Sequence, residues 1–175
     1  MKVGSFHDEI HQYGATDWHE QKEVVKSWIN KTVFLPREKI QWFDSDRYTS
    51  KQFYKDDFIK TFQQNIKMFC NDIGKPLQVE EVWIVRYQKR DFHPPHAHGA
   101  KGYSGILMAE FDENEHTGPW FVQDNPDPIT DRTNYCAPKV FEGDIIFSPS
   151  RLLHFTYPNT SDKERIIVGF DMKSI

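Results

Sequence analysis

Three histidines lie within six positions of one another in the stretch RDFHPPHAHGAKGYSG, residues 90–105. His96 and His98 are two positions apart, and in a β-strand residues i and i+2 project from the same face. Both imidazoles could therefore bind one metal ion. His93 precedes His96 by three positions, with two prolines between them, so on a regular strand it would face the other way. Taken alone, the pair His96 and His98 fits a metal site and a polar strand with surface histidines equally well.

A third candidate ligand, His154, lies in an apolar run between two leucines and a phenylalanine. A histidine among large apolar neighbours needs a hydrogen bond or a metal, because an unsatisfied polar group is costly to bury. As a single residue His154 would be a core histidine, but together with His96 and His98 it makes a shared metal the more economical interpretation. Iron, copper, nickel and zinc all bind imidazole, so these residues leave the metal open. The remaining histidines are predicted to be ordinary surface residues: His7, His11, His19 and His116.

One arginine near the C-terminus lies in a similarly apolar setting. Arg165 opens the predicted strand RIIVGFDM, in which Ile166, Ile167, Val168 and Phe170 are expected to be buried. An arginine drawn toward an apolar interior needs an anionic partner, and its planar guanidinium matches a carboxylate with two hydrogen bonds. If no protein carboxylate lies there, a dicarboxylic ligand could take its place. The alternative is a strand-end arginine whose charged head reaches the solvent.

The first part of the chain, residues 1–76, is expected to be mostly helical. The segment from Asp17 to Asn30 begins with an acidic capping residue and carries apolar residues at helical spacing. A second helix is predicted over KDDFIKTFQQNIKMFCNDIG, residues 55–74. Its apolar residues form one stripe, and Gly74 with Pro76 just beyond is a typical helix stop.

After residue 76 the hydrophobic pattern changes to the period of two that is typical of strands. Six strands are predicted, within residues 79–88, 103–111, 118–124, 139–150, 152–159 and 164–172. Strands without intervening helices favour an antiparallel sandwich or barrel. The HPP sequence is predicted to be a turn before a strand, with His96 and His98 at or near its beginning. We expect one domain, residues 1–175, mainly β, in which residues 77–175 form the β core and the N-terminal helices pack on it.

Composition narrows the classes of protein. The chain has 175 residues, 27% of them charged, and a formal net charge of −4, so it carries no broad basic surface for a nucleic-acid backbone. It has no apolar run long enough to span a bilayer, and its N-terminus lacks the apolar core of a signal peptide. Cys70 and Cys136 are far apart and form no metal or redox motif, so two reduced structural cysteines are expected. A cytosolic protein is predicted.

Several short motifs, in this order and spacing, resemble the 2-oxoglutarate/iron(II)-dependent oxygenases, and within them the branch related to prolyl hydroxylases. The resemblance covers about residues 79 to 172, roughly half of the chain. Its elements are His96-x-His98, Ser104-Gly105, Gly143, the run Phe147-Ser148-Pro149-Ser150, His154, Pro158-Asn159 and Arg165.

This resemblance implies a double-stranded β-helix, a jelly-roll barrel of two antiparallel sheets. It implies that His96 and His154 ligate Fe(II), that His98 stands where most of the superfamily has Asp or Glu, and that Arg165 binds the distal carboxylate of 2-oxoglutarate. Tyr87 is a further candidate contact to this co-substrate. The implied activity is that of a dioxygenase, a hydroxylase acting on a small molecule or peptide.

The pattern departs from the usual site of two histidines and one carboxylate. Three neutral imidazoles would leave the iron more positively charged, or a carboxylate could come from elsewhere, with Asp124, Asp144 and Glu110 as candidates. Two alternatives stay open. A metal-dependent cupin fits the spacing from Gly143 to His154 loosely but lacks the glutamate after the histidine pair. A jelly-roll module that binds a metal or ligand without turnover is the other alternative.

Overall fold

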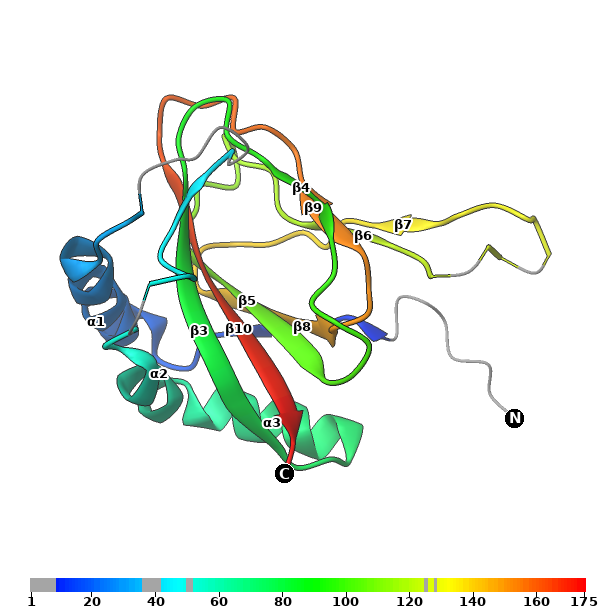
Figure 1. Ribbon diagram of the computed structural model, residues 1–175, viewed down its shortest axis with the longest axis horizontal. Helices are drawn as coiled ribbons and strands as arrows, with labels where there is room; N and C mark the ends of the chain where they lie inside the picture. The colour runs from blue at the N-terminus through cyan, green and yellow to red at the C-terminus, as the bar shows by residue number, and fades with distance from the viewer. Residues whose placement is uncertain (1–8, 36–41, 50–51, 125, 128) are drawn as a thin grey trace.

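The computed structural model describes residues 9–35, 42–49, 52–124, 126–127 and 129–175, and it consists of two antiparallel β-sheets that face one another (Figure 1). The larger sheet has the strand order β1-β8-β5-β10-β3-β2 and the smaller sheet the order β4-β9-β6-β7. The larger sheet comprises β1 (His11–Gly14), β2 (Asp44–Ser45), β3 (Leu77–Tyr87), β5 (Tyr103–Glu110), β8 (Asp144–Pro149) and β10 (Arg165–Ser174). The smaller sheet comprises β4 (His93–His96), β6 (Trp120–Val122), β7 (Tyr135–Cys136) and β9 (His154–Thr156).

Three helices cover one face of the larger sheet: α1 (Trp18–Lys31), α2 (Lys55–Thr61) and α3 (Gln63–Ile73) (Figure 1). The alternation of side chains along β10 shows how the faces are divided. Phe170 and its even-numbered neighbours pack in the same core as Trp28 of α1 and Phe58 of α2. The odd-numbered residues of β10 therefore face the smaller sheet.

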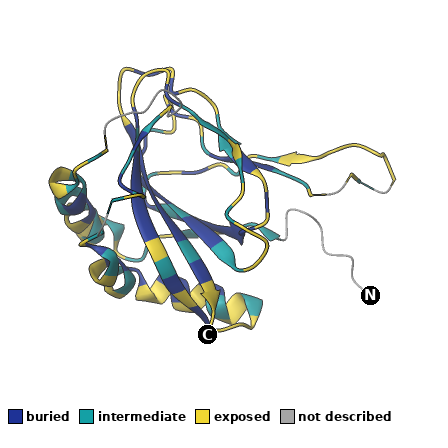
Figure 2. Cartoon of the chain, viewed as in Figure 1, coloured by how far each residue is buried: buried dark blue, intermediate teal, exposed yellow. Residues whose placement is uncertain are grey.

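A second core lies between the two sheets. Its largest members are Trp83 and Tyr87 from β3, Phe121 from β6 and Ile167 from β10. The central strands β5, β8 and β10 of the larger sheet are thus buried on both faces along most of their length, while the helices expose their outer sides (Figure 2). The larger sheet packs against the helices on one face and against the smaller sheet on the other. This is the arrangement of the predicted double-stranded β-helix, and the fold class is confirmed.

The N-terminal part contributes strands as well as helices. β1 pairs with β8 and β2 pairs with β3, so both edges of the larger sheet come from residues before position 76. All six predicted strands are present. β1, β2, β4 and β7 were not predicted, because two to four residues are too few to show a period of two and β4 contains two prolines.

Two details of the predicted helices are wrong. The run over residues 55–74 is divided at Phe62, whose backbone leaves the helical region (φ −104°, ψ 16°). Phe62 is buried against Trp28 and Phe58, so tertiary packing outweighs the continuous helical pattern. Asp17 precedes α1 in a left-handed conformation (φ 58°) and makes no side-chain capping hydrogen bond. The stop at Gly74 is confirmed, with φ at 65°.

Gly105 of β5 provides a test of this packing. A Cβ atom there would lie 2.0 Å from Cζ of Phe170, so Gly105→Ala should force Phe170 out of its position. We expect the free energy of unfolding to fall by about 1–3 kcal/mol, the usual cost of overpacking. Gly14→Ala is the matched control, because its nearest contact would be Asp144 at 3.9 Å. Urea denaturation measures both variants, and equal stabilities would contradict the close approach of β5 and β10.

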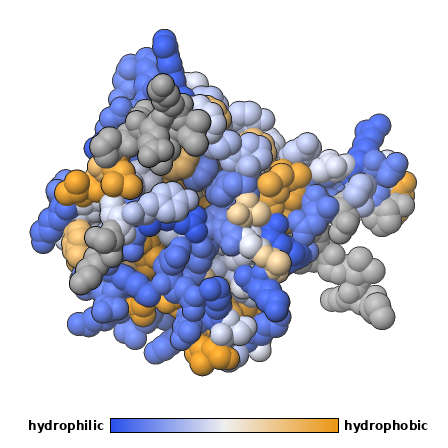
Figure 3. All heavy atoms as spheres, in the orientation of Figure 1, coloured by the Kyte–Doolittle hydropathy of each residue, from blue (hydrophilic) through white to orange (hydrophobic). Residues whose placement is uncertain are grey.

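Within the described residues, no helix is both long and apolar enough to cross a membrane. On the face drawn in Figure 3, hydrophobic residues form separate patches among hydrophilic ones.

Candidate metal centre

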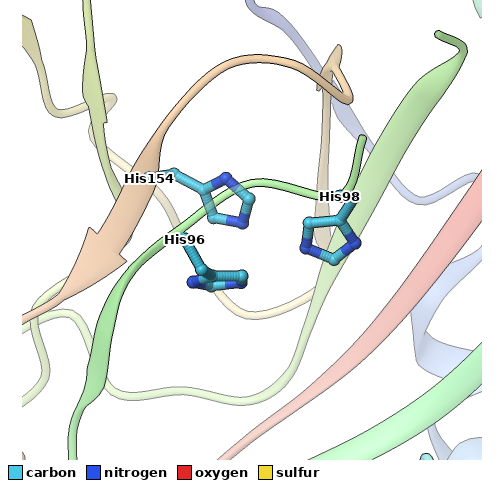
Figure 4. Close-up of side chains that lie close together, drawn as sticks. All are labelled: His96, His98 and His154. Carbon is cyan, nitrogen blue, oxygen red and sulfur yellow. The ribbon is translucent and has the colours of Figure 1, made fainter. Parts of the chain in front are cut away.

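Three imidazoles meet at one point between the sheets. His96 is the last residue of β4, His98 lies in the loop that follows, and His154 is the first residue of β9. One nitrogen from each ring lies within 4.8 Å of the others, and Figure 4 shows the rings turned toward a common space. The three predicted ligands are thus brought together by segments that are far apart in the chain.

The local geometry differs from the prediction. The HPP sequence is not a turn before a strand: it forms β4 itself, and His98 lies beyond the end of that strand. His96 pairs directly with His154 across the β4–β9 ladder. His98 is held instead by its backbone, whose N–H donates to the carbonyl of Ser150 at 2.8 Å. Convergence therefore comes from strand pairing and a fixed loop, not from two residues on one face of a strand.

Hydrogen bonds determine which ring nitrogen of His96 and of His154 is available to bind a metal. His96 Nδ1 lies 2.9 Å from the carbonyl oxygen of Pro94, and His154 Nδ1 lies 3.0 Å from that of Leu152. A carbonyl can only accept, so Nδ1 must carry the proton in both rings. Nε2 then keeps its lone pair, which is the form that binds a metal.

The electrostatic environment also keeps these rings neutral. Burial, reinforced by the neighbouring histidines, lowers the pKa of His96 to about 4 and that of His154 to about 3. A neutral imidazole is required for ligation, since a protonated ring has no free lone pair. The donor set therefore fits a divalent transition metal.

These lowered pKa values predict a pH-dependent stability of the metal-free protein. In the unfolded chain a histidine takes up a proton near pH 6.5, whereas folded His96 and His154 resist protonation. The unfolded state then binds more protons, so the free energy of unfolding should fall as the pH drops from about 6.5 to about 4, by roughly 1.4 kcal/mol per pH unit for each group.

Urea denaturation between pH 7.5 and 4.5 measures this slope. The variant His154→Ala should show a shallower slope than the wild type, because one of the histidines with a lowered pKa is gone while His93 and His96 remain. A slope that is the same in both proteins would mean that His154 is protonated in the folded state.

Sequence reasoning missed one carboxylate at this site. Asp171 Oδ1 lies 2.8 Å from Nδ1 of His98. The signal was present, because Asp171 is six residues after Arg165 on the same predicted strand and so shares its face. Burial would raise the pKa of Asp171, but its contacts with His98, Ser104 and Arg47 outweigh burial and hold the pKa below its usual range.

The three carboxylates suggested as additional ligands lie elsewhere. Asp124 pairs with Arg151, Asp144 accepts hydrogen bonds from Gln12 and from the backbone of Phe141, and Glu110 lines a separate charged pocket beside α1. In the described part of the chain, the cluster of candidate ligands contains histidines alone.

His93 does not face away from the site, contrary to the prediction. Its ring stacks on that of His96, with centroids 3.9 Å apart and planes 11° from parallel. Its Nδ1 lies 2.9 Å from the hydroxyl of Tyr87. The register of β4 shifts between His93 and His96, and this irregularity turns both rings to the same side.

The other histidines have different surroundings. His116 is buried rather than on the surface, with its ring hydrogen-bonded to the backbone of Asp112 and Lys163. His11 is half-buried in β1, and His19 is exposed on α1. His7 lies outside the described residues.

Arg165 is a buried cation, with 1% of its surface exposed. Its guanidinium lies over the ring of Tyr87, 4.4 Å from the ring centroid, and donates to Thr117, to the hydroxyl of Thr156 and to the carbonyl of Tyr157. Every one of these acceptors is neutral. Its Nε has no hydrogen-bond partner among the described residues, so this buried donor and its charge fit an anionic ligand.

A pocket connects the histidines with the surroundings of Arg165. Tyr87 and Thr156, which both contact Arg165, line one end of it. The rest of the wall is largely apolar, with Trp83, Ile106 and Ile167. A ligand in this pocket could touch the histidines at one end and groups bound to Arg165 at the other.

The sequence matches a family model described as "Putative 2OG-Fe(II) oxygenase" over residues 81–171, slightly more than half of the chain. This region includes His96, His98, His154 and Arg165. A search of curated proteins gave no significant match.

Solved structures with the same fold belong to several different proteins. The epimerase SnoN from nogalamycin biosynthesis, in complex with Fe3+, alpha ketoglutarate and nogalamycin RO, is 13% identical over 95% of this chain and 79% of its own, with a TM-score of 0.71. Collagen prolyl hydroxylase from Paramecium Bursaria Chlorella virus-1, in a 2OG complex, is 15% identical over 95% and 96%, with a TM-score of 0.64. HygX from Streptomyces hygroscopicus, with nickel, 2-oxoglutarate and hygromycin B bound, is 11% identical over 95% and 83%, with a TM-score of 0.67.

Proposed function

The chain belongs to the family of 2OG-Fe(II) oxygenases, and we propose that it is a hydroxylase in which His96, His98 and His154 hold the iron and Arg165 binds 2-oxoglutarate. Fe(II) and 2-oxoglutarate are the cofactors of this family. The roles of the individual residues are the proposal.

One observation supports the proposal: three imidazoles converge in a pocket that is also lined by Tyr87 and Thr156, two contacts of a buried arginine whose Nε has no hydrogen-bond partner among the described residues. His96 and His154 have their Nδ1 protons bound by backbone carbonyls, so each offers Nε2 inward. Arg165 supplies a buried cation whose hydrogen-bond acceptors Thr117, Thr156 and Tyr157 are all neutral and whose Nε has no hydrogen-bond partner among the described residues. This arrangement supports a metal site and a dicarboxylate site that share one pocket.

In this proposal some residues bind the metal and the co-substrate, and others exclude water from the site. When bound, Fe(II) and 2-oxoglutarate would allow dioxygen to act as the oxidant: one of its oxygen atoms enters succinate, formed with CO2 from 2-oxoglutarate, and the other hydroxylates a C–H bond. The three histidines fix the metal, and Arg165 with Tyr87 orients the far carboxylate of the co-substrate. Burial raises the pKa of the Tyr87 phenol, so it stays protonated and can donate to an anion. The apolar wall around Ile106 and Ile167 keeps water from the reacting groups.

The family match favours the oxygenase over a cupin-type enzyme, because the matched region includes Arg165, which a cupin does not require. A non-catalytic binding module is the remaining competitor, and three neutral ligands are the feature that supports it. We also propose a cytosolic enzyme that acts on a small molecule or peptide. The free thiols Cys70 and Cys136 support the cytosolic location, since thiols stay reduced there.

Turnover of the co-substrate separates these functions. Purified protein supplied with Fe(II), 2-oxoglutarate, ascorbate and oxygen should form succinate, measured by proton NMR, and omission of iron should stop it. His96→Ala should form none, whereas His19→Ala, a histidine removed from the exposed face of α1, should match the wild type. Bound iron and 2-oxoglutarate without any succinate would instead support the non-catalytic module.

A further inference from the structure

The carboxylate beside His98 is built into the fold on the inner face of β10. Arg165, Ile167, Gly169 and Asp171 alternate along this face; Ile167 and Gly169 line the histidine pocket, whereas Asp171 lines a neighbouring pocket together with His98. Asp171 lies at the far end of this row, with 16% of its side chain exposed, and its Oδ1 is 2.8 Å from His98 Nδ1. The Nδ1–H bond of His98 does not point straight at this oxygen, so a small rotation of the ring completes the hydrogen bond.

Other contacts hold Asp171 in place. The hydroxyl of Ser104 donates to its Oδ1 at 2.8 Å, and Arg47 Nη2 lies 3.0 Å from its Oδ2. Arg47 also stacks over Trp83, 3.9 Å from the ring centroid, and Trp83 stacks in turn on His98. Carboxylate and imidazole are thus oriented by one network.

The backbone of β10 is shaped to admit this network. A Cβ atom at Gly169 would lie 2.5 Å from the indole of Trp83, so only glycine at this position lets Trp83 lie flat beside His98. Asp171, Trp83 and Gly169 therefore form a continuous support beneath the third candidate ligand.

The three candidate ligands differ in what binds their Nδ1 proton. For His96 and His154 the acceptor is a neutral backbone carbonyl. For His98 the acceptor in reach is the carboxylate of Asp171, 2.8 Å from Nδ1, and a small rotation of the ring would complete the hydrogen bond. A carboxylate behind a metal-bound imidazole fixes its tautomer and makes the ring a stronger donor. It also places one negative charge near a site whose direct ligands carry none.

We propose that Asp171 is a positioning residue that acts through His98, fixing its Nδ1–H tautomer and supplying the negative charge that the three imidazoles lack. The proposal rests on the proposed metal centre. It explains how a histidine can stand where most of the superfamily has a carboxylate. The negative charge is supplied by Asp171, which lies behind His98 and does not bind the metal directly.

The test is Asp171→Asn, which keeps the shape and removes the charge. The dissociation constant for Fe(II), measured anaerobically by competition with a chelator, should rise by about 10- to 100-fold, the usual effect of losing such a partner. In metal-free protein with 15N-labelled histidine rings, the Nδ1 signals of His98 should shift, while those of His96 and His154 stay in place.

The matched control is Glu81→Gln. Glu81 pairs with Asp171 across the β10–β3 ladder and lies 3.4 Å from the same Arg47, but it is exposed and belongs to the outer end of the ion cluster. This variant removes the same charge from the same cluster and should change iron affinity less than about threefold.

Three results would overturn the inference: iron affinity of Asp171→Asn within about threefold of the wild type, an equal loss in Glu81→Gln, or ring signals that move at all three histidines alike. A wild type that binds no Fe(II) would contradict the proposed metal centre instead. The 15N spectra of the histidine rings are recorded on metal-free protein. They therefore test the contact between Asp171 and His98 even if the wild type binds no Fe(II).

Discussion

Replacement of His154 with alanine should raise the dissociation constant for Fe(II) by more than 100-fold. The loss should exceed the roughly 10- to 100-fold cost of removing a supporting residue, because a direct ligand disappears. His154 is buried, its Nδ1 proton is held by the carbonyl of Leu152, and its strand partner is His96. With it gone, two imidazoles remain, one of them on a loop.

Anaerobic equilibrium dialysis against Fe(II) measures this effect, with His19→Ala as the control for the loss of a histidine far from the site. Circular dichroism of the metal-free variant establishes that it is folded. An affinity equal to that of the wild type would show that the metal, if bound, is not held at the β4–β9 pair.

Replacement of Arg165 with methionine should abolish tight binding of 2-oxoglutarate while iron binding persists. Methionine retains much of the apolar volume and removes the buried charge, including the unsatisfied Nε. Hydrogen bonds to charged groups contribute about 1.5–3 kcal/mol each, so loss of two of them should weaken binding by at least about 100-fold. Fe(II) affinity should change less than about threefold, because the hydrogen-bond partners of Arg165 are Thr117, Thr156 and Tyr157, and none of them is a candidate metal ligand.

Isothermal titration of the cobalt-loaded protein with 2-oxoglutarate measures this change without turnover. Arg151→Met is the matched control, since Arg151 is a half-exposed arginine that pairs with Asp124 on the surface. Unchanged affinity for 2-oxoglutarate in Arg165→Met would place the distal carboxylate at another residue.

Much of the barrel could be predicted from the sequence, because the long strands are rich in apolar residues. β3, β5 and β10 have eight to eleven residues, and β5 and β10 are buried along most of their length. β4 was missed for a physical reason. Its four residues are His-Pro-Pro-His, prolines are disfavoured in strands, and only pairing with β9 makes this segment a strand.

The candidate metal ligands and Arg165 could be predicted from the sequence, but the residues that contact the ligands, His93 and Asp171, were harder to predict. His96, His98, His154 and Arg165 stand out by residue type in apolar or repeated surroundings. His93 was misplaced because a regular strand was assumed, whereas the register shift in β4 turns its ring onto His96. Asp171 could have been found by counting along the predicted last strand from Arg165, since residues six apart share a face.

The most direct test of the proposed site is an anaerobic titration of the metal-free protein with Fe(II) and then with 2-oxoglutarate, followed by visible absorption. A charge-transfer band should appear in the wild type only when both are present. It should be lost in His154→Ala and strongly weakened in Arg165→Met, which would place iron, co-substrate and Arg165 in one cavity. Bound iron without any band in the wild type would contradict the proposed oxygenase site and favour a three-histidine centre that does not bind 2-oxoglutarate.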